Sequence, residues 1–393
     1  MSAHALTTSA FKSQLEAMGL QVAYNRLANE PYKIGMLPWD NSPGQRPWRE
    51  TDDARLIAMM EDVLGATKEK TVLRALTIYA DDNSYDPLVQ LFDSFAWDGV
   101  ERAETLVIDY LGAEDCPYTK AATRVLLSEI VSRVYHPGCK ADIMPILCGP
   151  GGCGKSTFSR GLGVEDRYYC DSVANIADVK GNGEVIRGKI VVEVPELAGM
   201  SKRRIEGVKA AITRQTDEFR GAYCRRSGSF PRRAVYVGTT NSVDFITENN
   251  GGERRFLPIP CRVSKPAKSV FEPTFRVDVK QAYAEVRQWM IAGDDRFSVT
   301  LSPEMEAVAH VVRDSFTEEN PLVQKVKEYL DAHRDELVCT SAVLDFLGIQ
   351  KGMSAYKEMG LILSNIGEGW QSCTKRLCPP YGRQKCWRYV GDD

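Results

Sequence analysis

The sequence predicts an α/β protein: a mainly parallel sheet flanked by helices, preceded by a helical domain and followed by a winged-helix-like domain. Short apolar runs alternate with helical patterns in the middle of the chain, as strands alternate with helices in parallel sheets. Apolar residues recur at helical spacing before that segment, and three helical patterns followed by a basic, aromatic ribbon come after it. We therefore expect three domains, over residues 1–140, 141–300 and 301–393, the last opening with a linker helix.

The expected elements follow from apolar spacing and from capping residues. In the first domain the helical pattern is clearest over 54–64, 88–95, 103–111 and 121–135, and His136-Pro137-Gly138 ends the last of these helices. The middle domain has buried-strand candidates at 143–148, 190–194 and 234–238, and helices at 155–162, 203–213 and 275–293. The linker helix is expected at 301–318, and the last helices at 322–330, 340–347 and 355–366.

The composition excludes several classes of protein. The 393 residues include 50 Lys and Arg against 53 Asp and Glu, a net charge of −3, so a DNA site has to be a local basic patch. No apolar run is long enough for a membrane span, and the amino terminus lacks the pattern of a secretory signal. We therefore expect a cytoplasmic protein without membrane contacts. The 11 cysteines are scattered, and no Cys/His set has the spacing of a zinc site.

A glycine-rich motif lies between the first strand candidate and the following helix. Residues 149–156 read GPGGCGKS and match the phosphate-binding pattern G-x-x-x-x-G-K-[ST] in the context that the pattern requires. Glycines let backbone N–H groups turn toward phosphate oxygens, and the helix directs its positive end at the same anion. The lysine would reach the β- and γ-phosphates, and the serine would bind Mg²⁺. The sequence therefore predicts a P-loop site for ATP and Mg²⁺ built by Gly149, Gly151, Gly152, Cys153, Gly154, Lys155, Ser156 and Thr157.

Two glutamates mark the end of the second strand candidate, which reads IVVEVPE from Ile190. In P-loop ATPases one carboxylate at this position belongs to the magnesium shell, and another polarises the attacking water. Glu193 and Glu196 could supply both, and their spacing leaves the two roles exchangeable. Glu193 is closer to the strand and is the candidate metal ligand together with Ser156. The alternative interpretation is a solvated strand end.

The third strand candidate ends in Thr239-Thr240-Asn241, at the edge where open sheets place ligands. We expect the amide of Asn241 to hold the attacking water, although an asparagine there can also serve only as a turn former. Arg254 and Arg255 follow on a Gly-Gly loop. They suit an arginine finger that neutralises transition-state charge, which a neighbouring subunit commonly supplies. A surface ion pair is the alternative.

These motifs occur in an order that resembles the virulence-associated protein E family. The resemblance runs from about Trp48 to Pro260 and rests on DDNSYDP, FAWDGVERAETLVIDYLG, YHPGCK, GPGGCGKST, VVEVPEL, VKAAITRQTDEFRGAY, VYVGTTN and GGERRFLPIP. The family groups with superfamily-3-like helicases of phages and plasmids and with the helicase half of poxvirus-type primase-helicases. The resemblance implies an AAA+-like ATPase that assembles into a ring, usually hexameric, and moves on DNA.

The resemblance implies the roles described above for the glycine-rich loop, the acidic strand end and the arginine pair. It also implies that Asn241 is the sensor residue. One departure is that the two acids of this chain are not adjacent, which keeps their roles exchangeable. A second departure concerns the primase-like domain that many relatives carry before this region. Here the helical domain starts almost at residue 1, so we expect no priming activity in the chain, and a primase or other replication proteins as possible partners.

Basic residues gather between the acidic strand and the sensor strand. Residues 201–233 hold ten Lys and Arg against three acids, interleaved with Tyr223 and Phe230; helicases of the resembled type carry a pore-facing hairpin here. Residues 351–390 are also basic and aromatic, which suits a DNA-touching wing or a protein-docking surface. In the first segment, a solvated charged helix and turn is the alternative to DNA contact. The expected DNA-binding residues are Arg220, Arg225, Arg226, Arg232 and Arg233, with Arg225 and Arg226 at the loop tip.

Together these features favour an ATP-dependent DNA helicase or translocase for replication of a mobile genetic element. The alternative is a nucleotide-switched DNA-binding initiator that melts or marks an origin without processive unwinding. A small-molecule kinase fits less well, because Asn241 and the arginine pair have no clear role in phosphoryl transfer to a metabolite.

Overall fold

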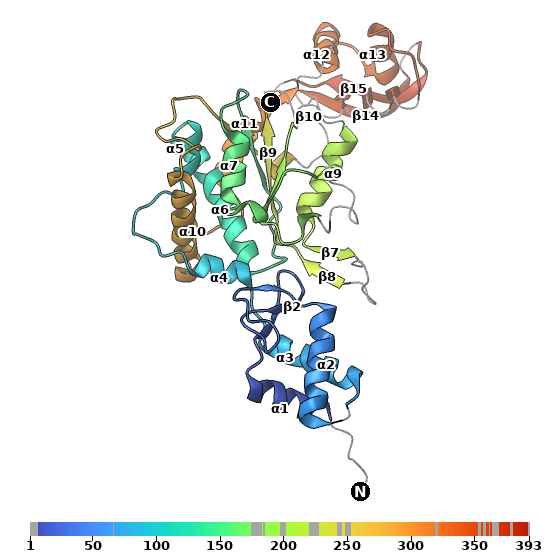
Figure 1. The fold of residues 1–393 in the computed structure, drawn as a ribbon. Coiled ribbons are helices and arrows are strands. Elements are labelled where there is room, and N and C mark those ends of the chain that lie inside the picture. The colour runs from blue at the N-terminus through green and yellow to red at the C-terminus, as the bar shows by residue number, and fades with distance from the viewer. Residues whose placement is uncertain are drawn as a thin grey trace.

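A computed structural model gives the fold in three successive units (Figure 1). The residues that it describes are 7–65, 67–173, 183, 185–196, 202–219, 228–241, 246–247, 253–318, 321–352, 355–356, 359–360, 362–363, 369–377 and 380–391.

The amino-terminal unit combines helices with a small antiparallel sheet. Its elements are α1 (Thr8–Met18), β1 (Val22–Asn25), β2 (Glu30–Lys33), β3 (Arg46–Pro47), α2 (Glu50–Leu64) and α3 (Glu69–Asp82). The strands pair in the order β1-β2-β3, and Phe11, Leu56 and Leu76 belong to a separate buried cluster of this unit. The helical character agrees with the sequence pattern. The sheet was not predicted, because strands of two to four residues leave almost no alternation to detect.

The next three helices pack on the central unit and share its core. They are α4 (Pro87–Asp93), α5 (Leu106–Leu111) and α6 (Pro117–Tyr135). Leu88, Val107 and Leu126 from these helices lie in one buried cluster with Phe158 and Tyr283. Helix α6 is buried around almost its whole circumference, as expected of a helix enclosed by a sheet and by other helices.

The central unit is built on a five-stranded sheet in which every neighbouring pair is parallel. Its strands are β4 (Met144–Cys148), β5 (Tyr169–Cys170), β6 (Val191–Val194), β9 (Val235–Thr240) and β11 (Phe256–Pro260), in the order β11-β4-β9-β6-β5. The expected parallel sheet flanked by helices is confirmed. Strands β5 and β11 were not predicted, the first because it has two residues and the second because it contains two prolines. Prolines are tolerated in β11 because it is an edge strand.

Helices cover both faces of this sheet. On one face, α4–α6 pack with α7 (Lys155–Leu162) and α10 (Thr274–Ala292). On the other, α9 (Lys202–Thr213) contributes Ile205, Val208 and Ile212 to a second cluster with Ile146 and Val192. Helix α11 (Pro303–Asp314) contacts α6 and β11. The unit also contains two minor strand pairs, the antiparallel hairpin β7 (Thr216–Phe219)–β8 (Gly228–Pro231) and the parallel pair β10 (Ile246–Thr247)–β12 (Thr317–Glu318).

The carboxy-terminal unit has its own small core and lies at the opposite end of the central unit from the amino-terminal unit (Figure 1). It contains α12 (Pro321–Ala332), β13 (Val338–Cys339), α13 (Thr340–Phe346), β14 (Trp370–Leu377) and β15 (Arg383–Tyr389). Its three strands pair antiparallel in the order β13-β15-β14. The helices expected near 322–330 and 340–347 therefore precede a two-stranded ribbon, as the sequence predicts. Part of the helix expected at 355–366 lies outside the described residues.

The close approach of α7 and α10 provides a test of core packing. A methyl group on Gly161 of α7 would lie 2.1 Å from Phe275 Cε1 of α10. We expect Gly161→Ala to lower the free energy of unfolding by about 1–3 kcal/mol through overpacking, although alanine itself favours a helix by about 1 kcal/mol. The measurement is the shift of the urea transition. Gly352→Ala is the control, because a methyl there meets no atom within 4 Å. Equal shifts for both variants would contradict the packing.

Candidate functional site

The glycine-rich loop connects β4 to α7 at the carboxyl edge of the sheet. The amide N–H of Gly149 donates to the carbonyl of Thr240 on β9 (3.1 Å), which ties the start of the loop to the neighbouring strand. Gly152 and Gly154 have φ values of 76° and 98°, a region that favours glycine. A methyl group on Gly154 would also lie 2.6 Å from Val270 Cγ2. Glycine at this position therefore satisfies both the backbone conformation and the close packing.

Lys155, the first residue of α7, is buried and turns back into this loop. Its Nζ donates to the carbonyl oxygens of Gly149 (2.6 Å) and Pro150 (2.9 Å) and to Oδ1 of Asn241 (2.9 Å). Asn241 directly follows β9, which lies beside β4 in the sheet. The structure thus brings together the lysine and the amide that the sequence assigns to one site.

Glu193 of β6 is only 2% exposed and accepts three side-chain hydrogen bonds. Ser156 Oγ donates to Oε1 (2.7 Å), Thr239 Oγ1 donates to the same oxygen (2.8 Å), and the Tyr169 hydroxyl donates to Oε2. Burial and the bond to Glu193 raise the pKa of Tyr169 well above its usual range, so its hydroxyl stays a donor. Tyr169 was not found from the sequence, since β5 is too short to give a pattern.

A cavity of about 430 Å³ opens above these groups. Glu196 lines it and is exposed, with a positive φ of 52°, which is uncommon for a residue other than glycine and is a pointer to a functional position. Phe271 lines the same cavity, and no sequence motif includes it. The lining comprises residues 151–157, Pro195, Glu196, Thr239, Thr240, Asn241 and Phe271.

The donor set suits Mg²⁺ bound mainly through a substrate. Ser156 and Glu193 offer hard oxygen atoms, which Mg²⁺ prefers, and the two side chains are already in contact. Within the described part of the chain, no group of three or more His, Cys, Asp or Glu side chains is arranged to hold a metal by itself. Mg²⁺ at such sites usually keeps waters and substrate phosphates as its other ligands, so the residues fit the ion.

Arg254 and Arg255 lie at the amino-terminal ends of the strands, whereas the glycine-rich loop lies at their carboxyl ends. They belong to the short helix η3 (Glu253–Arg255), which immediately precedes β11. Strand β11 runs parallel to β4 with Phe256 opposite Met144 and Pro260 opposite Cys148. The arginine pair therefore precedes the strands, whereas the glycine-rich loop follows them, roughly 15 Å further along. Arg254 is exposed, and the buried Nε of Arg255 has no hydrogen-bond partner among the described residues.

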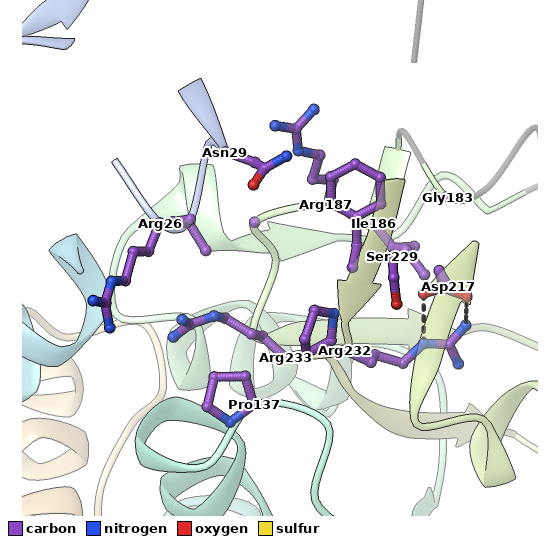
Figure 2. Close-up of a pocket in the computed structure, with 14 residues that line it drawn as sticks. Arg26, Asn29, Pro137, Gly183, Ile186, Arg187, Asp217, Ser229, Arg232 and Arg233 are labelled. Atoms are coloured by element: carbon purple, nitrogen blue, oxygen red, sulfur yellow. Dashed lines mark hydrogen bonds and ion pairs between the residues drawn. The ribbon is translucent and has the colours of Figure 1, made fainter. Parts of the chain in front are cut away.

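The expected DNA-binding arginines divide into two groups. Arg220, Arg225 and Arg226 fall between β7 and β8, outside the described residues. Arg232 and Arg233 follow β8 and line a cavity of about 230 Å³ between the amino-terminal and central units (Figure 2).

The contacts of Arg232 and Arg233 favour a structural role over the expected DNA contact. Arg232 is 4% exposed; its guanidinium pairs with the buried Asp217 of β7 and donates to the carbonyl of Ala211. Arg233 pairs with Asp86 and donates to the carbonyl of Val134 (3.1 Å). Counting charges along the sequence suggested a basic patch, but the folded chain neutralises these two with distant carboxylates.

The fold and the loop define an α/β protein with the architecture of nucleotide-binding folds. A model of the virulence-associated protein E-like domain matches residues 92–318. This is more than half of the chain, and the protein belongs to that family.

Similar folds are known. A structure described as the apo structure of the NrS-1 C terminal region (305-718) superposes with a TM-score of 0.52 at 12% identity, covering 99% of this chain and 100% of that one. The A form apo structure of the same region gives 0.49 at 10% identity, covering 98% and 100%. The first likeness shows a shared fold. No curated protein matches the chain. None of the described helices has the length and hydropathy of a membrane span.

The structural role of Arg232 can be tested by a double-mutant cycle. Arg232→Met leaves the buried carboxylate of Asp217 with only the longer ion pair to Arg214 (3.6 Å), so we expect it to lower the free energy of unfolding by about 3–5 kcal/mol. The double variant Arg232→Met/Asp217→Leu should be less destabilised than Arg232→Met alone. Urea unfolding of the two single variants, Arg232→Met and Asp217→Leu, and of the double variant measures both effects. Unchanged stability together with a flatter salt dependence of DNA binding would instead indicate a DNA contact.

Proposed function

We propose that this protein is a P-loop, AAA+-like ATPase that acts in the cytoplasm as a DNA helicase or translocase in replication of a mobile genetic element. One observation carries the proposal. Lys155, Ser156, Glu193 and Asn241 come from three separate segments and meet at the carboxyl edge of β4, β9 and β6, beside a cavity of about 430 Å³. Ligands bind at this edge in open parallel sheets.

The loop is suited to a triphosphate. Its glycines and the start of α7 place backbone N–H groups and a helix amino terminus next to the cavity. Lys155 is held by two carbonyls and one amide oxygen, all of them neutral. Phosphate oxygens carry charge and form stronger bonds with an ammonium group. ATP would therefore draw Nζ away from Asn241 and leave that amide free to hold the attacking water.

We propose different roles for the two glutamates, because their surroundings differ. Glu193 is buried and bonded to Ser156, so we assign this pair to the magnesium shell. Mg²⁺, when bound, supplies positive charge to the phosphates. Glu196 is exposed to the cavity and is assigned as the general base that takes a proton from the attacking water. The sequence alone left these roles exchangeable.

The position of the arginine pair supports ring assembly. Arg254 or Arg255 precedes β11, so neither reaches the loop that follows β4 in its own subunit. An arginine finger from this pair has to act on the neighbouring subunit. A closed ring, which we take to be hexameric as in the family resembled, gives each site such a neighbour.

DNA contact is assigned to the hairpin β7–β8 and to the carboxy-terminal unit. Arg220, Arg225 and Arg226 lie in the segment that joins the two hairpin strands. In the carboxy-terminal unit the element order and the strand order β13-β15-β14 support a winged helix, with the basic β14–β15 ribbon as its wing. A separate primase or other replication proteins would complete the machinery.

The test of the function is ATP hydrolysis with and without single-stranded DNA, together with strand displacement on forked DNA. A helicase hydrolyses ATP faster with DNA and releases the displaced strand. The alternative, a nucleotide-switched initiator, binds or melts DNA but does not displace a long strand. Absence of ATP hydrolysis under all conditions would contradict the helicase, and absence of nucleotide binding would contradict both functions.

The glutamate assignment predicts two different defects. Glu196→Gln should bind ATP normally but hydrolyse it about 10²–10⁴-fold more slowly, the range for loss of a general base. Glu193→Gln should lose the magnesium dependence of ATP binding, because the amide is a weaker ligand than the carboxylate. Titration calorimetry with and without Mg²⁺ and steady-state hydrolysis measure these effects. Lys155→Ala is the reference for a site that does not hydrolyse ATP. Normal hydrolysis by both glutamine variants would contradict the assignment.

The position of the arginine pair predicts that mixing two inactive variants restores part of the ATP hydrolysis. Arg254→Ala or Arg255→Ala should bind ATP but hydrolyse it poorly, since a finger in trans contributes on the order of 10³–10⁵ in rate. Mixed with Lys155→Ala protein, it should regain part of the activity. Some interfaces of a mixed ring combine an intact loop with an intact arginine. No rescue in oligomers shown to be mixed would reject a role in trans.

A further inference from the structure

Phe271 is a large apolar side chain left exposed at the rim of the cavity. It is 68% exposed and is the one aromatic residue in the described lining of the cavity. Isolated exposed apolar residues are common on protein surfaces, so exposure alone indicates nothing. The contacts that hold the backbone around Phe271 in place are more informative.

The segment from β11 to α10 is fixed along its length by backbone hydrogen bonds. Cys261 N donates to the carbonyl of Cys148 at the end of β4 (2.6 Å). Further along, Arg262 N donates to Leu111 O (2.8 Å), and Lys268 N donates to Asp109 O (2.9 Å). The segment therefore follows α5 and approaches the glycine-rich loop without being free to leave it.

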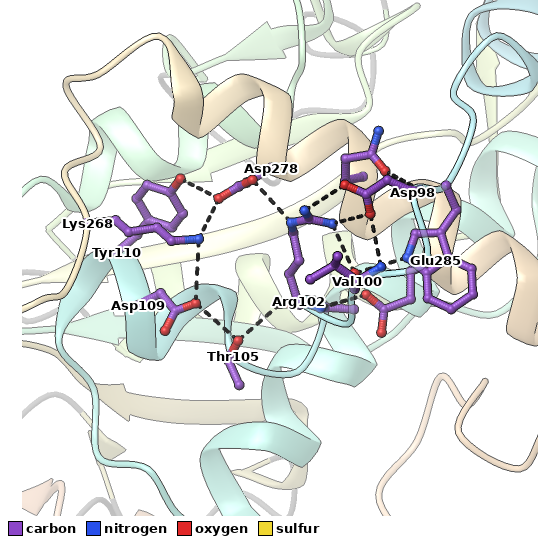
Figure 3. A network of polar contacts seen from close by, with 12 residues as sticks. Asp98, Val100, Arg102, Thr105, Asp109, Tyr110, Lys268, Asp278 and Glu285 are labelled. Carbon is purple, nitrogen blue, oxygen red and sulfur yellow. Dashed lines mark hydrogen bonds and ion pairs between the residues drawn. The ribbon is translucent and has the colours of Figure 1, made fainter.

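Side chains fix the part of the segment next to Phe271. Figure 3 shows Lys268 and Tyr110 both directed at Asp278 of α10. Lys268 Nζ lies 2.7 Å and the Tyr110 hydroxyl 2.8 Å from Asp278 Oδ2. Val270 is 6% exposed and packs against Gly154 of the loop. Phe271 is the next residue after Val270. Its backbone is therefore held close to the phosphate-binding loop, while its ring remains exposed.

We propose that Phe271 stacks on the base of the nucleotide whose phosphates occupy the glycine-rich loop; this rests on the proposed ATPase function. A planar ring on a rigid backbone is preorganised for stacking, and the exposed apolar surface is covered when the base binds. Lys155, Ser156, Glu196 and Asn241 of the cavity are already assigned to phosphate, metal and water.

This arrangement defines the substrate class. In the described cavity Phe271 offers the aromatic face, and the other lining side chains belong to the glycine-rich loop and to the ends of β6 and β9. Stacking depends on ring area and tolerates different bases. The site therefore accepts purine nucleoside triphosphates, with similar affinity for ATP and GTP and weaker affinity for CTP and UTP, whose bases have a single ring.

The test compares Phe271→Ala, Phe271→Trp and wild-type protein by titration calorimetry with ATP, GTP, CTP and inorganic tripolyphosphate. Phe271→Ala should weaken ATP and GTP binding on the order of tenfold, reduce the preference for purines, and leave tripolyphosphate binding unchanged. Phe271→Trp should retain the wild-type affinity. Phe346→Ala is the matched control, because Phe346 is 56% exposed on α13 and does not line the cavity.

Any of the following three outcomes would overturn the proposal. Unchanged ATP binding by Phe271→Ala rejects stacking, and the ATPase function still stands if Lys155→Ala lowers ATP affinity. Equal weakening of ATP and tripolyphosphate means that Phe271 acts by supporting the loop instead of contacting the base. Failure of wild-type protein to bind any nucleotide rejects the proposed function together with this inference.

Discussion

The parallel register of β4, β9 and β6 is the constraint on which the candidate site depends. Strand β9 lies between the other two, with Ile146 opposite Gly238 and Glu193 opposite Val237. The loop after β4, Asn241 after β9 and the carboxylate of β6 therefore meet at one edge. A slip of one residue in β6 would turn Glu193 to the other face of the sheet and separate it from Ser156.

The polar groups of the site are satisfied by one another, which keeps them in place at low cost. A buried carboxylate or ammonium without partners is strongly disfavoured, and here Glu193 accepts three hydroxyl donors while Lys155 donates to three oxygens. All of these partners are neutral, so under the proposed function a charged phosphate or metal would replace them. The network accordingly supports both a stable fold and ligand exchange.

The sequence predicted the parts of the site that are written as local patterns. The loop, Glu193 and Asn241 each lie within or directly after an apolar strand that can be recognised in the sequence. Tyr169 and Phe271 have no such signal, because their positions depend on a two-residue strand and on a segment fixed by tertiary contacts. Arg232 is the opposite case: local charge suggested a basic patch, whereas the side chain pairs with Asp217 inside the fold.

The measurement that tests the central claim most directly is a structure of the protein with Mg²⁺ and a non-hydrolysable ATP analogue. The account predicts a triphosphate in the loop of residues 149–156, with Lys155 Nζ on a phosphate oxygen and no longer 2.9 Å from Asn241 Oδ1. It also predicts that Ser156 Oγ is a ligand of the metal. A nucleotide bound elsewhere, with Lys155 still bonded to Asn241, would contradict the account.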